Sequence, residues 1–146
     1  MPLARFEENG VVIEVILQRD SATVGRLVAT FTPLDPRMHL YSKDLPHSGG
    51  RGLGRPTLLE IVSSHELTAG GVLTANHPTI PLSVPTVRAK LPVYPTGPVT
   101  LTLPVSIAAV PGDTSWLSVT YMACSDRVCL APVVDHHIAV VIPAYP

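Results

Sequence analysis

The sequence predicts an all-β fold, an immunoglobulin-like antiparallel β-sandwich, from its breaker residues, its composition and its short alternating segments. Of 146 residues, 16 are proline and 10 are glycine, and their spread from end to end leaves no room for a long helix. Hydrophobic residues make up 46% of the chain but aromatic residues only 5%, so the core is built mainly from Val, Leu, Ile and Ala. That mixture favours strands. We expect one domain over residues 1–146.

The predicted strands follow the alternation of apolar and polar residues along the chain. The clearest is Val99–Ile107, where Val, Leu and Ile alternate with Thr, Pro and Ser. Pro104 cannot donate a hydrogen bond to a neighbouring strand, which places this position at a sheet edge or a bulge. A turn is expected over Val110–Asp113. In chain order, the other predicted strands are Val11–Leu17, Val24–Thr32, His39–Tyr41, Thr57–Val62, Gly71–Thr74, Trp116–Met122 and His137–Ile142.

Two long segments separate these strands. Lys43–Pro56 is rich in glycine and Ala75–Leu91 is rich in proline. Loops of this length in a compact domain often carry function. Within the first, Gly50–Gly54 loosely resembles a phosphate-binding loop, but Pro56 follows at once and no helix begins there. We interpret that run as a flexible turn.

Charge and hydropathy exclude several classes of function. The formal net charge is −1, and no run of Lys or Arg is present, which removes the electrostatic basis for binding nucleic acid or an anionic membrane. No stretch approaches the roughly 20 apolar residues that a membrane-spanning helix needs. The segment Met1–Glu8 lacks the features of a secretory signal, so either a signal was removed or none existed.

The two cysteines are the strongest candidates for a functional site. If the predicted strand continues to Cys124 and the chain returns from Cys129, the residues between them form a hairpin loop of ordinary length. Directly opposed positions would place the two Cα atoms about 4.5 Å apart, which permits a disulfide. So short a ring stabilises the fold by only about 2 kcal/mol. A structural pair and an exchange-active pair both fit this spacing, although a bridge at an exposed hairpin tip is open to an attacking thiolate.

The run Val119–Pro132 resembles the active-site hairpin of the N-terminal domain of DsbD, in the disulfide bond corrector protein family. The shared pattern is a Tyr, any two residues and a Cys, then a short loop, then a second Cys followed closely by Pro. Further landmarks in the same order are Met38–Tyr41, Arg55–Thr57, Gly71–Val72, Val93–Tyr94 and Leu101–Val105. The chain differs in having four residues between the cysteines, where some members have five, and His39 where some have an aromatic residue.

The resemblance implies thiol-disulfide exchange outside the cytoplasm, in the periplasm, without a bound cofactor. Reducing equivalents would pass from a thioredoxin-like donor to oxidised partners such as disulfide isomerases or the thioredoxin-like protein of cytochrome c maturation. By the same resemblance, Cys129 forms mixed disulfides and Cys124 resolves them. A cap loop within Asn76–Leu82, including Asn76 and His77, would shield the pair.

Three further residues are expected beside the cysteines: His39, Tyr41 and Tyr121. A protonated His39 could favour a thiolate, while the alternative is a surface histidine at a strand end. The domain is either free or part of a longer protein with a membrane electron-transfer domain.

A metal site built from Cys129, His136 and His137 is considered and rejected, because adjacent residues on a strand point to opposite faces. We therefore assign no metal site. The rival to exchange chemistry is a noncatalytic extracytoplasmic binding module whose hairpin disulfide is structural.

Overall fold

A computed structural model describes residues 1–84, 89–108, 112 and 114–146, and these residues form an antiparallel β-sandwich, as predicted. The expected turn at Val110–Asp113 lies, apart from Gly112, outside the described residues, as does part of the proline-rich segment. The strands are β1 (Pro2–Glu8), β2 (Val11–Arg19), β3 (Val24–Pro33), β4 (His39–Leu40), β5 (Leu58–Ser63), β6 (Leu67–Ala69), β7 (Thr74–Ala75), β8 (Ile80–Ser83), β9 (Lys90–Val93), β10 (Val99–Ile107), β11 (Thr114–Tyr121), β12 (Ala123–Cys124) and β13 (Val133–Val141).

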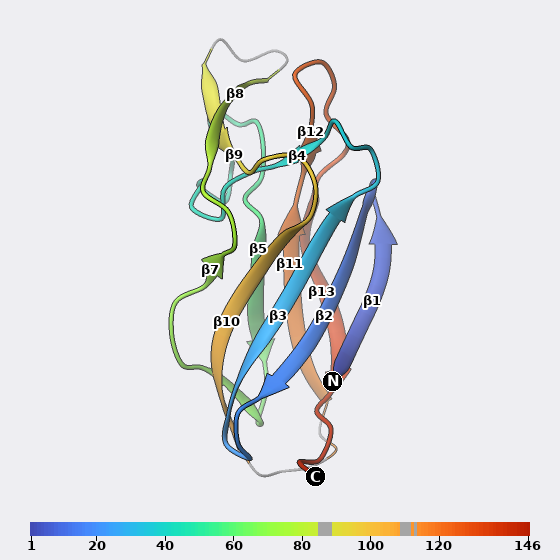
Figure 1. Ribbon diagram of the computed structural model, residues 1–146, viewed down its shortest axis with the longest axis vertical. Coiled ribbons are helices and arrows are strands. Elements are labelled where there is room, and N and C mark those ends of the chain that lie inside the picture. The colour runs from blue at the N-terminus through green and yellow to red at the C-terminus, as the bar shows by residue number, and fades with distance from the viewer. Residues whose placement is uncertain (85–88, 109–111, 113) are drawn as a thin grey trace.

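Two sheets face each other in the body of the molecule (Figure 1). The larger has the order β1-β2-β3-β10-β6, and β7 also pairs with β10. The smaller has the order β13-β11-β5. Strands β4 and β12 pair with each other, and β8 pairs with β9, beyond one end of the two main sheets. Both chain ends lie at the opposite end of the sandwich (Figure 1).

The alternation in the sequence explains how the sheets pack. Along β2 the buried positions are Val11, Ile13, Val15 and Leu17, each fully buried, while the residues between them are more exposed. Inward-facing residues of β3, β10, β11 and β13 complete one continuous apolar core. Burial of apolar surface at about 25 cal/mol per Å² is the main force that holds the two sheets together.

Strand β10 does not lie at an edge of the sheet, one of the two positions that Pro104 predicts. It pairs with β3 on one side and with β6 and β7 on the other. Its Pro104 carbonyl accepts a hydrogen bond from the Gly70 amide, in the chain that links β6 and β7. The nitrogen of Pro104, which carries no hydrogen to donate, faces the same side of β10. The neighbouring strand is interrupted there between β6 and β7, so no strand loses a hydrogen bond. The proline marks a break in the partner rather than the edge of the sheet.

Other differences concern short or irregular strands. The predicted strand at Gly71–Thr74 is wrong, because the structure forms β6 before it and β7 at its end. Strand β1 is not among the predicted strands, and it pairs along β2 with a register shift between Pro2 and Ala4. In the part of the chain that the structure describes, no helix is long and apolar enough to cross a membrane.

Candidate functional site

The two cysteines form a disulfide at the end of the sandwich that carries β4 and β12 (Figure 1). Their Cα atoms are 4.1 Å apart, close to the separation expected for directly opposed residues. Cys124 and Cys129 also form an isolated antiparallel bridge. The hairpin that the sequence predicts is therefore present, and the bond forms without displacement of the backbone.

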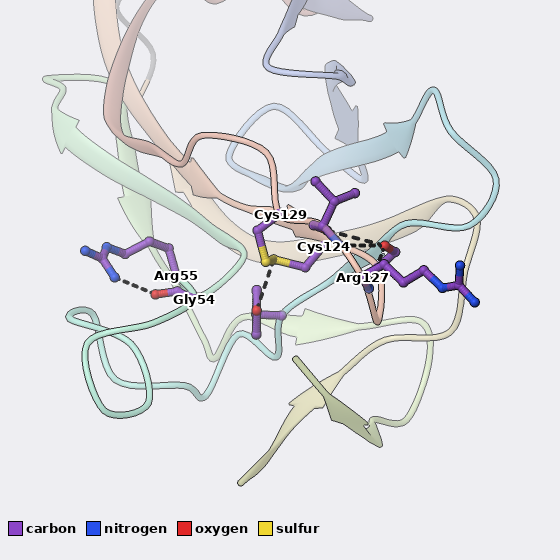
Figure 2. The surroundings of a disulfide bond; sticks show 8 residues. Gly54, Arg55, Cys124, Arg127 and Cys129 are labelled. Atoms are coloured by element: carbon purple, nitrogen blue, oxygen red, sulfur yellow. Dashed lines mark hydrogen bonds between the residues drawn. A yellow bond between two sulfur atoms is a disulfide. The ribbon is translucent and has the colours of Figure 1, made fainter. Parts of the chain in front are cut away.

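Ser125 organises the turn between the cysteines. Its amide donates to the Val128 carbonyl at 2.8 Å, and its Oγ accepts from the amides of Arg127 and Val128, both at 3.1 Å. The Leu130 amide then returns a hydrogen bond to the Ala123 carbonyl at 2.9 Å. These bonds satisfy the backbone of the short loop and hold its tip outward. Figure 2 shows Arg127 at this tip, beside the disulfide.

The two sulfur-bearing residues differ in their access to solvent. Cys124 is fully buried, whereas Cys129 is partly exposed and follows the exposed Val128. A hollow of about 350 Å³ is lined by Arg37 and by Ser125–Val128 on the hairpin. Neither cysteine lines this hollow, and it is the partial exposure of Cys129 that makes it the more accessible of the two.

Tyr41 contacts the buried sulfur. Its hydroxyl donates a hydrogen bond to Sγ of Cys124 at 3.1 Å, and burial raises the pKa of Tyr41 to about 12. The phenol therefore keeps its proton at neutral pH and remains a donor. Its backbone is held between Pro56 and Val93 through isolated bridges, and its carbonyl accepts from the Thr57 hydroxyl at 2.7 Å.

Gly54 covers the ring of Tyr41. A Cβ atom at this position would lie 2.8 Å from a ring carbon of Tyr41, and Gly54 has a φ of +79°. Glycine is required on both grounds, because a side chain would collide with the ring and this φ disfavours other residues. The glycine-rich segment predicted to be a flexible turn is thus a defined loop against the tyrosine. Figure 2 shows Gly54 and Arg55 on the other side of the disulfide from Arg127.

A second apolar cluster, separate from the main core, surrounds the disulfide. We call it the cysteine cluster. Its members come from three regions that are far apart in the sequence, within 41–53, 82–93 and 122–129. They are Tyr41, Leu45, Val84, Leu91, Val93, Met122 and Cys124, with Leu53, Leu82 and Cys129 packed against them. The β8–β9 hairpin supplies Leu82, Leu91 and Val93, so this hairpin packs into the cluster that contains the disulfide.

His39 lies directly opposite Cys124 in the β4–β12 pair. Its Nδ1 is 2.7 Å from the Tyr94 carbonyl, and since a carbonyl only accepts, the imidazole donates through Nδ1. The half-buried ring is oriented by this bond. The structure therefore places His39 beside the cysteine hairpin, with one ring nitrogen already hydrogen-bonded.

The remaining candidate residues lie elsewhere. Asn76 is exposed and pairs with the start of β10, where its Oδ1 accepts from the Thr100 amide at 2.9 Å. His77 is exposed, and within the described ranges no contact joins it or Asn76 to the cysteines. Tyr121 belongs to the main core, and its hydroxyl donates to the Glu8 carbonyl at 2.9 Å. Burial raises the pKa of Tyr121.

The sequence indicates function for the long segments that hold Gly54, Val84 and Leu91, but it does not single out these three residues. Gly54 stands in a glycine-rich run, which is a signal for positive φ, but the contact with Tyr41 depends on tertiary structure.

His136 and His137 do point apart, as expected. His136 stacks on Phe6 and lies 3.2 Å from a Glu8 carboxylate oxygen, whereas His137 is paired with Ser118 on the outer face of β11.

Comparisons with known proteins identify solved structures with a similar fold. No family model matches the sequence, and no curated protein matches it. The N-terminal periplasmic domain of ScsB from Proteus mirabilis superposes with a TM-score of 0.56 at 13% identity, over 94% of this chain. The Neisseria meningitidis DsbD N-terminal domain, in its reduced form, superposes with a TM-score of 0.51 at 16% identity, over 84% of this chain and 87% of that chain.

The chain has the fold of the DsbD N-terminal domain. It spans 49% of the ScsB domain, about half of that chain's length. The cysteine hairpin, the tyrosine beside it and the apolar β8–β9 hairpin are features of this chain's own structure. Together they set the chemical environment of the two sulfur atoms.

Proposed function

We propose that this protein exchanges thiols and disulfides through Cys124 and Cys129, relaying reducing equivalents between thioredoxin-like proteins outside the cytoplasm. The observation that carries the proposal is the asymmetry of the disulfide. One sulfur is buried and accepts a hydrogen bond from Tyr41, while the other belongs to the partly exposed Cys129. Exchange needs one sulfur that can be reached and a second that can leave and return.

Reduction of the domain begins with a donor thiolate that attacks Sγ of Cys129. The bond from Cys129 to Cys124 breaks, and Cys124 leaves as a thiolate while the donor and Cys129 form a mixed disulfide. The donor's second thiol, once deprotonated, then attacks the donor sulfur of that mixed disulfide and releases Cys129 as a thiolate. Two electrons have passed to this domain, and the donor leaves as a disulfide.

Tyr41 favours the first of these steps. The hydroxyl already lies at Cys124, so it donates to the thiolate as the negative charge develops there. A hydrogen bond to a charged acceptor contributes about 1.5–3 kcal/mol, more than one to a neutral sulfur. A leaving thiolate that is stabilised in this way departs faster. The buried, hydrogen-bonded Cys124 and the more exposed Cys129 support attack at Cys129 and departure and resolution by Cys124.

Delivery of the electrons uses the same roles in reverse. The Cys129 thiolate attacks a disulfide of an oxidised partner and forms a mixed disulfide, and one partner sulfur leaves as a thiolate. Cys124 then attacks Sγ of Cys129, restores the internal disulfide and releases the reduced partner. We propose disulfide isomerases and a thioredoxin-like protein of cytochrome c maturation as acceptors. A membrane electron-transfer domain in the same polypeptide is the proposed source of the electrons, through a thioredoxin-like donor.

A redox titration tests the proposal against the rival noncatalytic binding module. The oxidised protein is equilibrated with a reduced thioredoxin-like protein, and the disulfide and dithiol forms are separated after alkylation. We expect rapid equilibration and a potential at or above the thioredoxin value of about −270 mV. A potential below about −300 mV together with slow equilibration would identify a structural disulfide and contradict the proposed function.

A further inference from the structure

Three side chains with metal-binding atoms meet on the outer face of the smaller sheet. His47 comes from the loop between β4 and β5, Glu60 from β5 and Asp135 from β13. One ligand atom of each lies within 4.8 Å of the others. All three residues are exposed, so an ion can reach them from solvent. They are 13 and 75 positions apart along the chain (47 to 60, and 60 to 135), so only folding brings them together.

The distances approach those of a coordination sphere. Nε2 of His47 lies 3.4 Å from Oδ1 of Asp135. Two ligand atoms on a tetrahedral zinc ion, with bonds of about 2.0–2.2 Å, are separated by about 3.3–3.5 Å. These two groups are thus at ligand spacing before an ion binds, and Glu60 completes the set with a side-chain rotation.

A buried hydroxyl beneath this cluster is a separate indication of a ligand. Ser118 is 3% exposed, and its Oγ has no hydrogen-bond partner among the described residues. Ser118 lies directly opposite Glu60 in the β11–β5 pair, so the two side chains share the outer face. An unpartnered buried hydroxyl costs about 1–3 kcal/mol. Because this oxygen is closed to water, its partner has to come from a neighbouring side chain, and the Glu60 carboxylate directly opposite can accept from it when Glu60 turns to hold an ion.

Thr120, two residues further along the same face, positions Asp135. Its Oγ1 accepts a hydrogen bond from the Asp135 amide at 3.0 Å and lies 3.5 Å from Oδ1 of the same residue. Groups that hold a ligand in place in this manner raise the affinity of metal sites. The carboxylate of Asp135 is therefore directed toward His47 without a change of backbone.

We propose that His47, Glu60 and Asp135 form a binding site for a divalent transition-metal ion, with zinc as the preferred ion. One imidazole and two carboxylates, with remaining positions open to water, suit zinc among the common divalent ions. Calcium and magnesium favour sites built from oxygen ligands alone. The bound ion would connect the loop that holds His47 to β5 and β13.

Calorimetric titration with zinc chloride tests the site. The protein carries no polyhistidine tag and is kept fully oxidised, because a free dithiol binds zinc by itself. We expect one zinc ion per chain. His47→Ala and Asp135→Asn should each weaken the affinity at least tenfold. His77→Ala, which removes an exposed histidine outside the cluster, should leave the affinity unchanged.

Thermal unfolding in the presence of a chelator shows whether each variant is folded before titration. Glu60→Gln provides a third variant in case one of the others is unstable. Zinc that raises the unfolding temperature of the wild-type protein but not of the folded variants would support the site. The absence of saturable binding, or equal affinity in the wild-type protein and the cluster variants, would overturn the proposal.

Discussion

The Tyr41 hydroxyl and Sγ of Cys124 lie 3.1 Å apart, although 83 positions separate the two residues in the sequence. Strand β4 and the bridges of Tyr41 to Pro56 and Val93 fix the tyrosine backbone, and Gly54 lies against its ring. The Tyr41 hydroxyl, which donates the hydrogen bond, is therefore held at the buried sulfur of Cys124 by contacts on several sides. This rigidity makes the two cysteines chemically unequal.

The first prediction concerns the division of labour between the cysteines. Cys124→Ser should trap a mixed disulfide with an oxidised thioredoxin-like protein, because Cys129 is accessible and the resolving sulfur is gone. Cys129→Ser should trap little, because Cys124 is fully buried. Nonreducing electrophoresis with mass spectrometry measures the adducts. Equal trapping by both variants would contradict the assignment of roles.

Tyr41→Phe should slow reduction of the disulfide by a thioredoxin-like donor by about tenfold, the effect of losing a hydrogen bond of about 1.5 kcal/mol to the leaving thiolate. Burial raises the pKa of Tyr41 to about 12, so its hydroxyl stays protonated below that pH. The ratio of wild-type to variant rates should therefore be constant from about pH 5 to about pH 9. Stopped-flow kinetics measures the rates, with Tyr145→Phe, an exposed tyrosine, as the control.

The increase in the pKa of Tyr41 on folding also predicts how the stability of the protein declines at alkaline pH. The pKa rises from 10.0 to about 12 on folding, so the protonated phenol is the form that the fold favours. Its contribution to stability is present below about pH 10 and is lost as the pH rises toward 12. Denaturant unfolding across this range should show a smaller decline for Tyr41→Phe than for the wild-type protein. An equal decline in both would show that Tyr41 is not responsible.

Gly54→Ala should destabilise the protein more than Gly52→Ala, although both glycines lie in one loop with similar φ values of +79° and +78°. At Gly52 a Cβ meets nothing within 4 Å, whereas at Gly54 it would lie 2.8 Å from the Tyr41 ring. Both substitutions carry a backbone cost of about 1 kcal/mol. We expect a further loss of about 1–3 kcal/mol for Gly54 from steric overlap. Urea unfolding of the two variants isolates this contact.

Leu91→Ala should make the disulfide more reactive toward a small dithiol such as dithiothreitol. Leu91 is 7% exposed and belongs to the cysteine cluster, so its truncation removes part of the apolar cover. A loss of stability of about 2 kcal/mol should accompany the change. Ile80→Ala, at an exposed position of the same hairpin, is the control. The rate of reduction is followed by alkylation, and an unchanged rate would argue against a shielding role.

Local patterns account for the parts of the structure that the sequence predicts. Strand β10 has the predicted bounds because apolar residues alternate along its whole length, and the cysteine hairpin depends on six consecutive positions, 124–129. Strand β8 lies in the proline-rich segment and β9 begins at its end, and each has only four residues, too few for an alternation to predict a strand. The segment does contribute to the cysteine cluster, but through Leu82 and Leu91 rather than through the predicted Asn76 and His77.

Contacts between distant segments cannot be predicted in this way. The sequence shows that Pro104 lacks an amide donor, which indicates a sheet edge or a bulge, whereas the break between β6 and β7 is visible only in the fold. The cluster of His47, Glu60 and Asp135 depends on how a loop crosses the outer face of a sheet. Family resemblance predicts Tyr41 near the cysteines, but its hydrogen bond to Cys124 is visible only in the folded structure.

The position of the chain ends has a practical consequence. Both ends lie at the pole of the sandwich opposite the disulfide (Figure 1). A linker or a fluorophore attached at either end would leave the reactive hairpin facing outward. The molecule can therefore be immobilised on an electrode or a sensor surface in one orientation, and a soluble partner would still find the sulfur of Cys129 within reach.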